Sequence, residues 1–252
     1  MNGSCERTGT RSDTTILVTE KALALSSRVL RAAGFVHGFS LRTEGDPLRP
    51  LSAAIGLSTD AVHQATQVHG ARILRARGDP DATRREEADA LVAAAPFAVG
   101  VRVADCVPVL VGDRASGVVA AIHAGWRGTV AGVIAAALDQ MPAGAKVAAI
   151  GPCIGPCCFE VGADVGAQIS SACGQRGQAG VVARRGGGGG GGGDKVYVDL
   201  RLAVRTLLRA AGVADADIDD VPGCTRCDAV RFHSYRRDGA NAGRHLAVIG
   251  AR

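Results

Sequence analysis

The chain has 252 residues, 47% of them hydrophobic, which is enough to bury one large core. Its net charge is +5, from 29 basic and 24 acidic residues, but the arginines are scattered and only 3% of residues are aromatic. Proteins that bind nucleic acid typically carry a basic stripe or stacking aromatic side chains. We therefore expect no nucleic-acid partner, and the excess of arginine favours a small anionic substrate.

We expect neither a secretory signal nor a membrane span in this sequence. The longest apolar candidate, residues 90–101, ends at Arg102 and is shorter than the ~18 residues that suggest a membrane span. Residues 1–15 are polar and lack the apolar core of a signal peptide. We expect a cytoplasmic protein with no membrane partner and with its eight cysteines mostly reduced. The sequence indicates no oligomeric state.

In chain order, residues 1–14 are expected to be disordered, and residues 15–252 to form a single domain. Residues 15–40 predict short strands around a small amphipathic segment. The apolar runs 88–93 and 97–111 predict buried strands, and Asp105 and Cys106 fall inside the second run. A charged side chain in the middle of a buried run needs a partner or a function.

The second half of the chain predicts alternating strands and helices, namely strands at 117–123, 146–150, 195–200 and 245–249 and helices at 129–141, 163–173 and 201–211. The first strand–helix–strand unit implies a crossover between parallel strands. Asp199 is expected to cap the last helix. The eight consecutive glycines at 186–193 predict a flexible loop, because a phosphate-binding loop needs specific spacing and a following helix.

His69, Cys106 and His123 are candidate metal ligands. Imidazole and thiolate together suit zinc, and three protein ligands leave a fourth position open, as in catalytic sites. Copper binds the same ligand types. The three residues are far apart in the sequence, so hydrogen-bonded turn histidines and a packed cysteine remain the alternative interpretation.

Cys106 is also a candidate nucleophile, with His123 or His69 as its base. Asp105 beside it is suited to proton transfer or to orienting a histidine, or it merely caps a turn. The nucleophile and metal hypotheses compete for the same atoms, because a thiolate bound to zinc is a poor free nucleophile.

Gly125 and Arg127 lie at a predicted helix N-terminus, where free backbone N–H groups and a guanidinium favour an anion. The alternative is a surface arginine beside turn glycines. Arg236 and Arg237 form a second anion-binding candidate, or a solvated face.

Cys224 and Cys227 form an isolated C-x-x-C pair. A structural zinc site needs a second pair at suitable spacing, and Cys153 and Cys157 are not spaced in that way. The adjacent Cys157 and Cys158 cannot easily bond to each other. We therefore favour packing, and not a second metal or a redox role, for these cysteines.

Five short motifs occur in order along the chain, at 67–70, 104–106, 123–128, 151–162 and 234–239. They read Gln-Val-His-Gly, Ala-Asp-Cys, His-Ala-Gly-Trp-Arg-Gly, Gly-Pro-Cys-Ile-Gly-Pro-Cys-Cys-Phe-Glu-Val-Gly and Ser-Tyr-Arg-Arg-Asp-Gly. In this order they resemble the YfiH-like family, also called the peptidoglycan editing factor, laccase-domain or polyphenol oxidoreductase family. The resemblance extends from about Gly34 to Ile249.

The resemblance implies an α+β fold with mixed β-sheets sandwiched by helices, and one zinc ion bound by His69, Cys106 and His123. It also implies a purine nucleoside phosphorylase with adenosine deaminase activity. The implied partners are phosphate and the nucleosides adenosine, inosine, guanosine and methylthioadenosine. A cysteine hydrolase that edits peptidoglycan precursors is the alternative. A multicopper laccase is disfavoured because the chain has only six histidines.

For phosphorolysis, Gly125 and Arg127 are expected to bind phosphate, with Arg42 and Gln67 as further substrate-binding residues. Asp105, Cys106 and Arg127 are the expected catalytic residues. The chain departs from the family pattern at 40–45, lacks the Ser-Leu-Asn-Leu-Gly segment that normally follows, and shortens the helix before Gln67 to 58–65. A catalytically impaired metal-binding homologue is therefore a further alternative.

Overall fold

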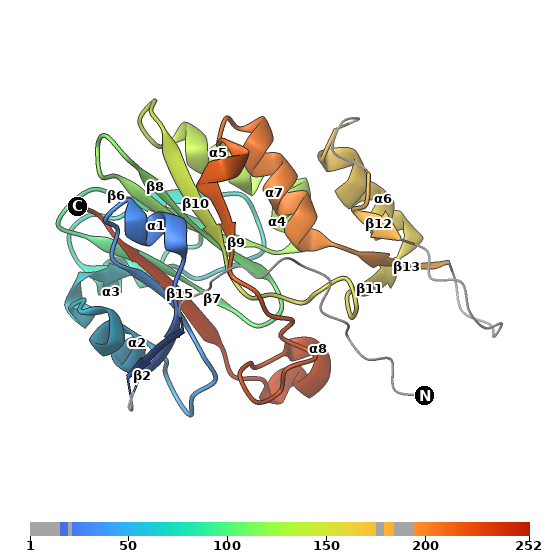
Figure 1. Ribbon diagram of the computed structural model, residues 1–252, viewed down its shortest axis with the longest axis horizontal. Helices are drawn as coiled ribbons and strands as arrows, with labels where there is room; N and C mark the ends of the chain where they lie inside the picture. The colour runs from blue at the N-terminus through green and yellow to red at the C-terminus, as the bar shows by residue number, and fades with distance from the viewer. Residues whose placement is uncertain (1–15, 20–21, 175–178, 184–193) are drawn as a thin grey trace.

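The computed structural model describes residues 16–19, 22–174, 179–183 and 194–252 (Figure 1). The predicted disordered segment 1–14 and the glycine run 186–193 lie outside the described residues, so both stay predictions.

The C-terminal strand lies inside the first of two six-stranded sheets. The order of this sheet is β1 (Ile16–Thr19), β2 (Ala22–Leu25), β3 (His37–Ser40), β15 (His245–Gly250), β7 (Ala98–Val103) and β4 (Val62–His63). Neighbouring strands are antiparallel except β4 and β7, which are parallel. The sheet therefore joins the two ends of the described chain.

The second sheet is also mixed. Its order is β14 (Ile218–Asp220), β10 (Lys146–Ile150), β8 (Val107–Asp113), β9 (Val119–Ala124), β6 (Ala90–Ala93) and β5 (Ile73–Arg75). Both β9 and β10 are antiparallel to β8, so they run in the same direction with β8 between them, as the predicted crossover requires. A small third sheet contains β11 (Glu160–Gly162), β13 (Lys195–Val198) and β12 (Val182–Ala183).

The α-helices are short. They are α1 (Arg28–Ala32), α2 (Leu48–Ile55), α3 (Pro80–Arg84), α4 (Trp126–Val130), α5 (Val133–Asp139), α6 (Ala163–Ala172), α7 (Leu200–Ala210) and α8 (Tyr235–Asp238). Short 3₁₀ turns occur at Thr59–Ala61, Asp215–Asp217 and Gly239–Asn241. Asp199 caps α7 as predicted, because its Oδ1 accepts a hydrogen bond of 2.9 Å from the backbone N–H of Leu202.

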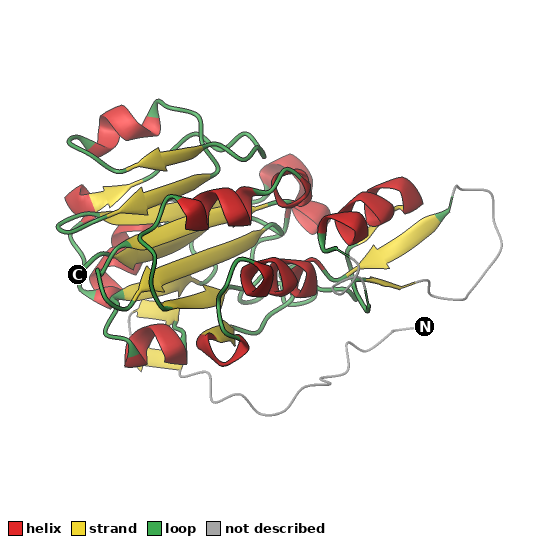
Figure 2. Cartoon of the chain, turned by 90° about the horizontal axis from the view of Figure 1, so that it is seen from above, coloured by secondary structure: helices red, strands yellow, loops and turns green. Residues whose placement is uncertain are grey.

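The alternation of side chains along the strands builds two cores. In β9, Ala120 and Ile122 pack in the core beneath α5 and α7, whereas Val119 and Ala121 pack in the core between the two large sheets. Leu51 of α2 packs on the outer face of the first sheet. Figure 2 shows α6 and the third sheet to one side of the large sheets. The predicted α+β fold, with mixed sheets sandwiched by helices, is confirmed.

The predicted strand 97–111 is wrong in one respect that matters for function. The run forms two strands, β7 and β8, which belong to different sheets, and Ala104, Asp105 and Cys106 form the connection between them. Asp105 has φ +87°, a left-handed conformation that no strand accommodates. Apolar content alone does not reveal this break, because the residues on both sides of it are buried.

The predicted helix 129–141 is likewise divided into α4 and α5. Gly132 lies between them with φ +86°, which glycine adopts without steric cost. The segment 58–65 contains a 3₁₀ turn and strand β4 in place of a helix.

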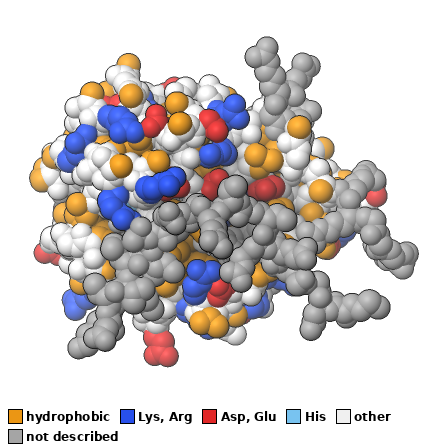
Figure 3. Space-filling view, in the orientation of Figure 1, with side chains coloured by type: hydrophobic (Ala, Val, Ile, Leu, Met, Phe, Trp, Pro, Cys, Tyr) orange, Lys and Arg blue, Asp and Glu red, His pale blue; other side chains and the backbone are white. Residues whose placement is uncertain are grey.

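No helix within the described ranges is both long enough and apolar enough to cross a bilayer. On the face shown in Figure 3, basic and acidic side chains are interspersed. An anion at this face would therefore have to be recognised by individual arginines and not by a broad basic surface.

The buried ring of His245 is held in its neutral form by the backbone. Its Nε2 accepts a hydrogen bond of 2.7 Å from the N–H of His233, and its Nδ1 lies 3.2 Å from the carbonyl oxygen of Ser40. A nitrogen that accepts a hydrogen bond carries no proton, so Nδ1 must be the donor. Burial, together with the nearby His233, lowers the pKa of His245 to about 4. Burial also lowers the pKa of His37.

We expect acid to destabilise the fold through His245. In the unfolded chain this histidine takes up a proton near pH 6.5, but in the folded chain only near pH 4. Its contribution to stability is therefore complete above pH 6.5 and is lost as the pH falls towards 4. The free energy of unfolding from urea titrations should fall by about 2 kcal/mol between pH 7 and pH 5 from this residue alone. His245→Gln should show a correspondingly smaller fall, and an unchanged pH dependence would contradict the assignment.

Candidate metal centre

The three predicted metal ligands come together from distant parts of the chain. His69 lies in the connection from β4 to β5, Cys106 in the connection from β7 to β8, and His123 near the end of β9. One ligand atom from each lies within 4.8 Å of the other two. The rings of His69 and His123 meet edge to face, with their centroids 4.8 Å apart.

The backbone beside the ligands leaves room for them only because residue 125 is glycine. A Cβ atom at Gly125 would lie 3.0 Å from Cδ2 of His69 and 3.1 Å from Sγ of Cys106, closer than side chains normally approach. Two imidazoles and one thiolate match the donor set of a catalytic zinc site and also suit copper. The residues present therefore fit a single metal ion with one position open.

A buried aspartate, Asp89, positions two of the ligands. Its Oδ1 accepts hydrogen bonds from Nδ1 of His123 (2.7 Å) and from the backbone N–H of His69 (2.9 Å). Its Oδ2 accepts from the N–H groups of Gly70 (2.7 Å) and Val68 (3.2 Å). Because Nδ1 of His123 is engaged in this way, its Nε2 is the nitrogen left for a metal ion.

Asp89 is fully buried, at 0% exposure. Burial by itself raises the pKa of its carboxyl group, but the hydrogen bonds from His123 and Gly70 outweigh that effect and lower the pKa. Asp89 is not among the site residues predicted from the sequence. The signal that singled out Asp105, a carboxylate inside an apolar run predicted to be buried, applies equally to Asp89 in the run 88–93.

Without a metal ion, the surroundings of Cys106 favour the thiolate, and those of His123 favour the protonated imidazole. Burial raises the pKa of the Cys106 thiol, but hydrogen bonds with His123 and His69 outweigh burial and lower the pKa to about 7. Burial lowers the pKa of His123, yet hydrogen bonds with Asp89 and Cys106 raise it to about 9. Cys106 is therefore readily deprotonated near neutral pH, as both a metal ligand and a nucleophile require.

The centre also contains two strained backbone positions. Among the described residues other than glycine, only His69 (φ +62°) and Asp105 (φ +87°) have positive φ angles. The carboxylate of Asp105 accepts hydrogen bonds from Oγ1 of Thr225 (2.5 Å) and from the backbone N–H of Arg236 (2.6 Å). These contacts, and the Asp89 contact to His69, keep both residues in place at the centre.

The three ligands line a cleft of about 630 Å³. Its other lining residues are Ala65, Gln67, Arg102, Val103, Ala104, Asp105, Ile154, Phe159, Tyr235, Arg236 and Arg244. The cleft thus brings the candidate metal ligands together with two aromatic residues and three arginines. Of these arginines, Arg102 pairs with Asp46 at 2.8 Å.

The structure separates the predicted anion-binding residues. Arg236 lines the cleft, whereas Arg237 pairs with Asp238 at 2.8 Å. Arg127 is exposed, with its guanidinium 4.7 Å from the centre of the Trp126 ring. Neither Arg127 nor Gly125 is among the described residues that line the cleft.

The two remaining predicted substrate-binding residues are held by backbone groups. The Gln67 amide donates to the carbonyl oxygen of Arg102 (2.7 Å) and accepts from its N–H (2.8 Å). Gln67 therefore joins its own loop to β7 at the wall of the cleft. Arg42 donates to the carbonyl oxygen of Ala229 (2.9 Å) and lines a separate cleft of about 540 Å³.

Comparison with known proteins shows the family to which the chain belongs. Residues 47–252 match the family described as multi-copper polyphenol oxidoreductase laccase. A purine nucleoside phosphorylase of Deinococcus radiodurans is 37% identical over 233 residues, covering 87% of this chain and 84% of the relative. Adenosine deaminase RL5, from an unknown prokaryotic organism, is 37% identical over 212 residues, covering 79% of this chain and 78% of the relative.

Two solved structures share the fold. YlmD of Geobacillus stearothermophilus superposes with a TM-score of 0.79 at 27% identity, covering 94% of this chain and 99% of its own. YfiH of Bacillus licheniformis superposes with a TM-score of 0.76 at 25% identity, covering 91% of this chain and 96% of its own. The chain therefore belongs to the YfiH-like, laccase-domain family, as its sequence motifs predict.

Replacing Asp89 should weaken metal binding. In Asp89→Asn, one carboxylate oxygen becomes an amide N–H₂ that faces backbone N–H donors, so the orientation of His69 and His123 is lost. We expect the zinc dissociation constant, measured by competition with a chromophoric chelator, to rise about 10- to 100-fold. Asp113→Asn is the matched control, because Asp113 is also fully buried but contacts Ser116 at the other end of β8. Equal zinc affinities in the two variants would contradict the positioning role.

Proposed function

We propose that this protein is a zinc-dependent purine nucleoside phosphorylase with adenosine deaminase activity. Its proposed substrates are adenosine, inosine, guanosine and methylthioadenosine, with phosphate as co-substrate. The observation that carries the proposal is the convergence of His69, Cys106 and His123 at a cleft with aromatic and arginine side chains. The relatives named as phosphorylases and as an adenosine deaminase support it.

Zinc is the ion that this donor set favours, and copper would compete for the same ligands. When bound with one position open, zinc polarises a substrate atom and makes a water molecule more acidic. A multicopper centre is not supported. Four of the six histidines are hydrogen-bonded away from the centre, namely His37, His63, His233 and His245.

The cleft offers separate places for the base and for the phosphate. The exposed ring of Tyr235 is assigned the surface on which a purine stacks, an interaction of about 1–3 kcal/mol per base. Phe159 is buried in the wall of the cleft, with the Arg236 guanidinium 5.6 Å from the centre of its ring. Arg236 and Arg244 supply guanidinium groups for the phosphate or the ribose. The alternative phosphate site is the one predicted from the sequence, formed by Gly125 and Arg127 with a contribution from Arg42.

We assign to Asp105 the transfer of a proton to or from the substrate. It lines the cleft next to Cys106, and its carboxylate is fixed by Thr225 and by the N–H of Arg236. A carboxylate held in this way exchanges a proton with a substrate in the cleft without first reorienting. Cys106 then serves as a metal ligand and not as a nucleophile.

The decisive assay uses purified protein and several purine nucleosides, with and without phosphate, with products identified by mass. We expect inosine to give hypoxanthine and ribose 1-phosphate only when phosphate is present, and adenosine to give inosine without it. His123→Ala should lose the zinc ion, and its rate of nucleoside turnover should fall at least 100-fold. If that variant loses zinc but releases hypoxanthine at the wild-type rate, the proposed chemistry is wrong. Bound zinc with no turnover of any nucleoside would favour a catalytically impaired homologue.

A cysteine hydrolase acting on peptidoglycan precursors is the second candidate. The observation that favours it is the lowered pKa of Cys106 beside His123. In such an enzyme Cys106 would attack the substrate, and metal would inhibit by blocking the thiolate.

Metal removal separates the two candidates. We expect a chelator to abolish activity and added zinc to restore it. Peptide mass spectrometry at pH 7.5 should show iodoacetamide alkylating Cys106 at least 10-fold faster after metal removal, because the thiolate is then exposed to the reagent. A metal-free enzyme that is fully active and is inactivated by alkylation of Cys106 would establish the hydrolase instead.

A further inference from the structure

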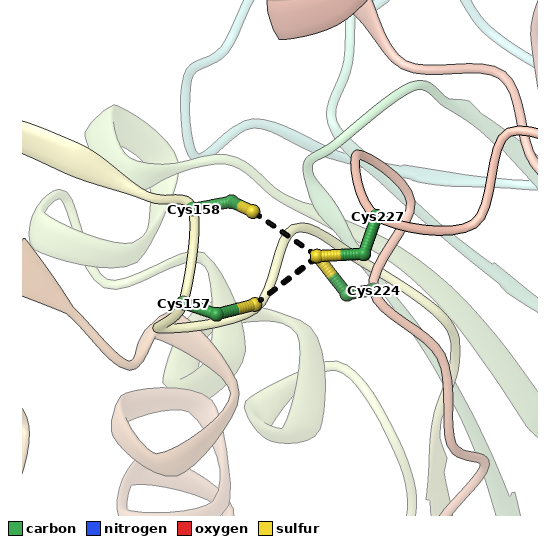
Figure 4. Close-up of side chains that lie close together, drawn as sticks. All are labelled: Cys157, Cys158, Cys224 and Cys227. Atoms are coloured by element: carbon green, nitrogen blue, oxygen red, sulfur yellow. Dashed lines mark hydrogen bonds between the residues drawn. The ribbon is translucent and has the colours of Figure 1, made fainter. Parts of the chain in front are cut away.

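A second group of side chains, apart from the metal centre, consists of Cys157, Cys158, Cys224 and Cys227. Figure 4 shows the first two on one loop and the last two on another, with the four sulfur atoms pointing towards one another. No disulfide joins these four cysteines in the part of the chain that the structure describes. The expectation that the C-x-x-C pair lacks partners is therefore wrong, because the adjacent pair 157–158 supplies them.

The sulfur atoms have the spacing of a tetrahedral metal site. All four lie within 4.8 Å of one another, and three of the separations are 3.3, 3.5 and 3.6 Å. Four thiolates around a zinc ion, with bonds of about 2.3 Å, have sulfur–sulfur distances of roughly 3.8 Å. A cluster of several irons would spread its thiolates farther apart. The arrangement therefore fits a single ion.

Two hydrogen-bond donors lie beside the sulfur atoms. The backbone N–H of Gly155 donates to Sγ of Cys224 at 3.3 Å. The Arg226 guanidinium donates a hydrogen bond to Cys158. A site of four thiolates needs such donors, because one divalent cation leaves it with a net charge of −2.

The two loops are already fixed relative to each other without a metal ion. Residues Cys153 and Cys224 form an isolated parallel bridge, in which the N–H of Thr225 donates to the carbonyl oxygen of Cys153 at 3.0 Å. From α7, Arg201 donates to the carbonyl oxygens of Gly151 and Gly223, one at the start of each loop. The four cysteines are therefore presented by a preorganised scaffold.

We propose that Cys157, Cys158, Cys224 and Cys227 bind one Zn²⁺ ion in a closed tetrahedral site, distinct from the His69–Cys106–His123 centre. Its role is structural, because four protein ligands leave no position for substrate. The ion would join the loop that carries Phe159, which lines the cleft, to the loop that carries Thr225, which contacts Asp105. Phe159 is next to Cys158, and Thr225 lies between the other two cysteines.

The test is the number of zinc ions per full-length chain, measured by native mass spectrometry and elemental analysis. We expect the Cys224→Ser/Cys227→Ser variant to hold one zinc fewer than the wild type and to melt at a lower temperature. His69→Ala/His123→Ala should retain the zinc bound by the four cysteines. Cys173→Ala is the matched control, because Cys173 is a buried cysteine outside both groups, and it should leave the zinc count unchanged.

A measurement on the wild type covers the case in which the cysteine variant does not fold. Protein reconstituted with Co²⁺ should show the intense visible and near-ultraviolet absorption of tetrahedral thiolate coordination. Three results would overturn the proposal: a zinc count unchanged by the cysteine replacements, iron in place of zinc, or two disulfides among the four cysteines. Because the count is read as a difference between variants, it stands or fails independently of the nucleoside chemistry.

Discussion

The candidate centre depends on one buried carboxylate. Asp89 accepts four hydrogen bonds, three from the backbone of the 68–70 turn and one from His123. These contacts stabilise the left-handed backbone of His69 and select the ring nitrogen that His123 presents. Without them, His69 would have no fixed position, because it lies on an exposed turn, and the ring of His123 would lose the hydrogen bond that orients it. The geometry of the candidate metal centre thus depends on a residue that is not one of the three candidate ligands.

Much of the fold, and the grouping of the candidate ligands, could be predicted from the sequence. Apolar runs predicted the strands around 117–123, 146–150 and 245–249, and the Asp199 cap fixed the start of α7. The ordered motifs correctly predicted the family, and the structure brings His69, Cys106 and His123 together. The strands and the helix cap are predictable because local periodicity and residue chemistry determine them. The grouping of the three candidate ligands was instead implied by the resemblance to the family.

What could not be predicted depends on which loops become neighbours. The run 97–111 is apolar throughout, so nothing in it indicated that its two halves join different sheets. Residues 157–158 were not recognised as the partner of 224–227, because they lack the usual spacing and only tertiary contacts, such as the bridge between Cys153 and Cys224, bring the two loops together. The predicted helix begins at residue 129, whereas α4 begins at Trp126 and so contains Arg127, whose side chain is exposed with its guanidinium 4.7 Å from the centre of the indole.

Because the chain passes between the two large sheets at the candidate centre, the positions of the ligands depend on how the sheets pack on each other. His69 and Cys106 lie on the segments in which the chain leaves the first sheet for the second, while His123 belongs to the second. An ion bound by all three residues would therefore link the first sheet to the second. A slight sliding of one layer over the other, caused for example by an altered side chain at Leu110 in the core between them, would stretch the coordination bonds. Substitutions in the core between the sheets would then change the affinity of the candidate centre for the ion.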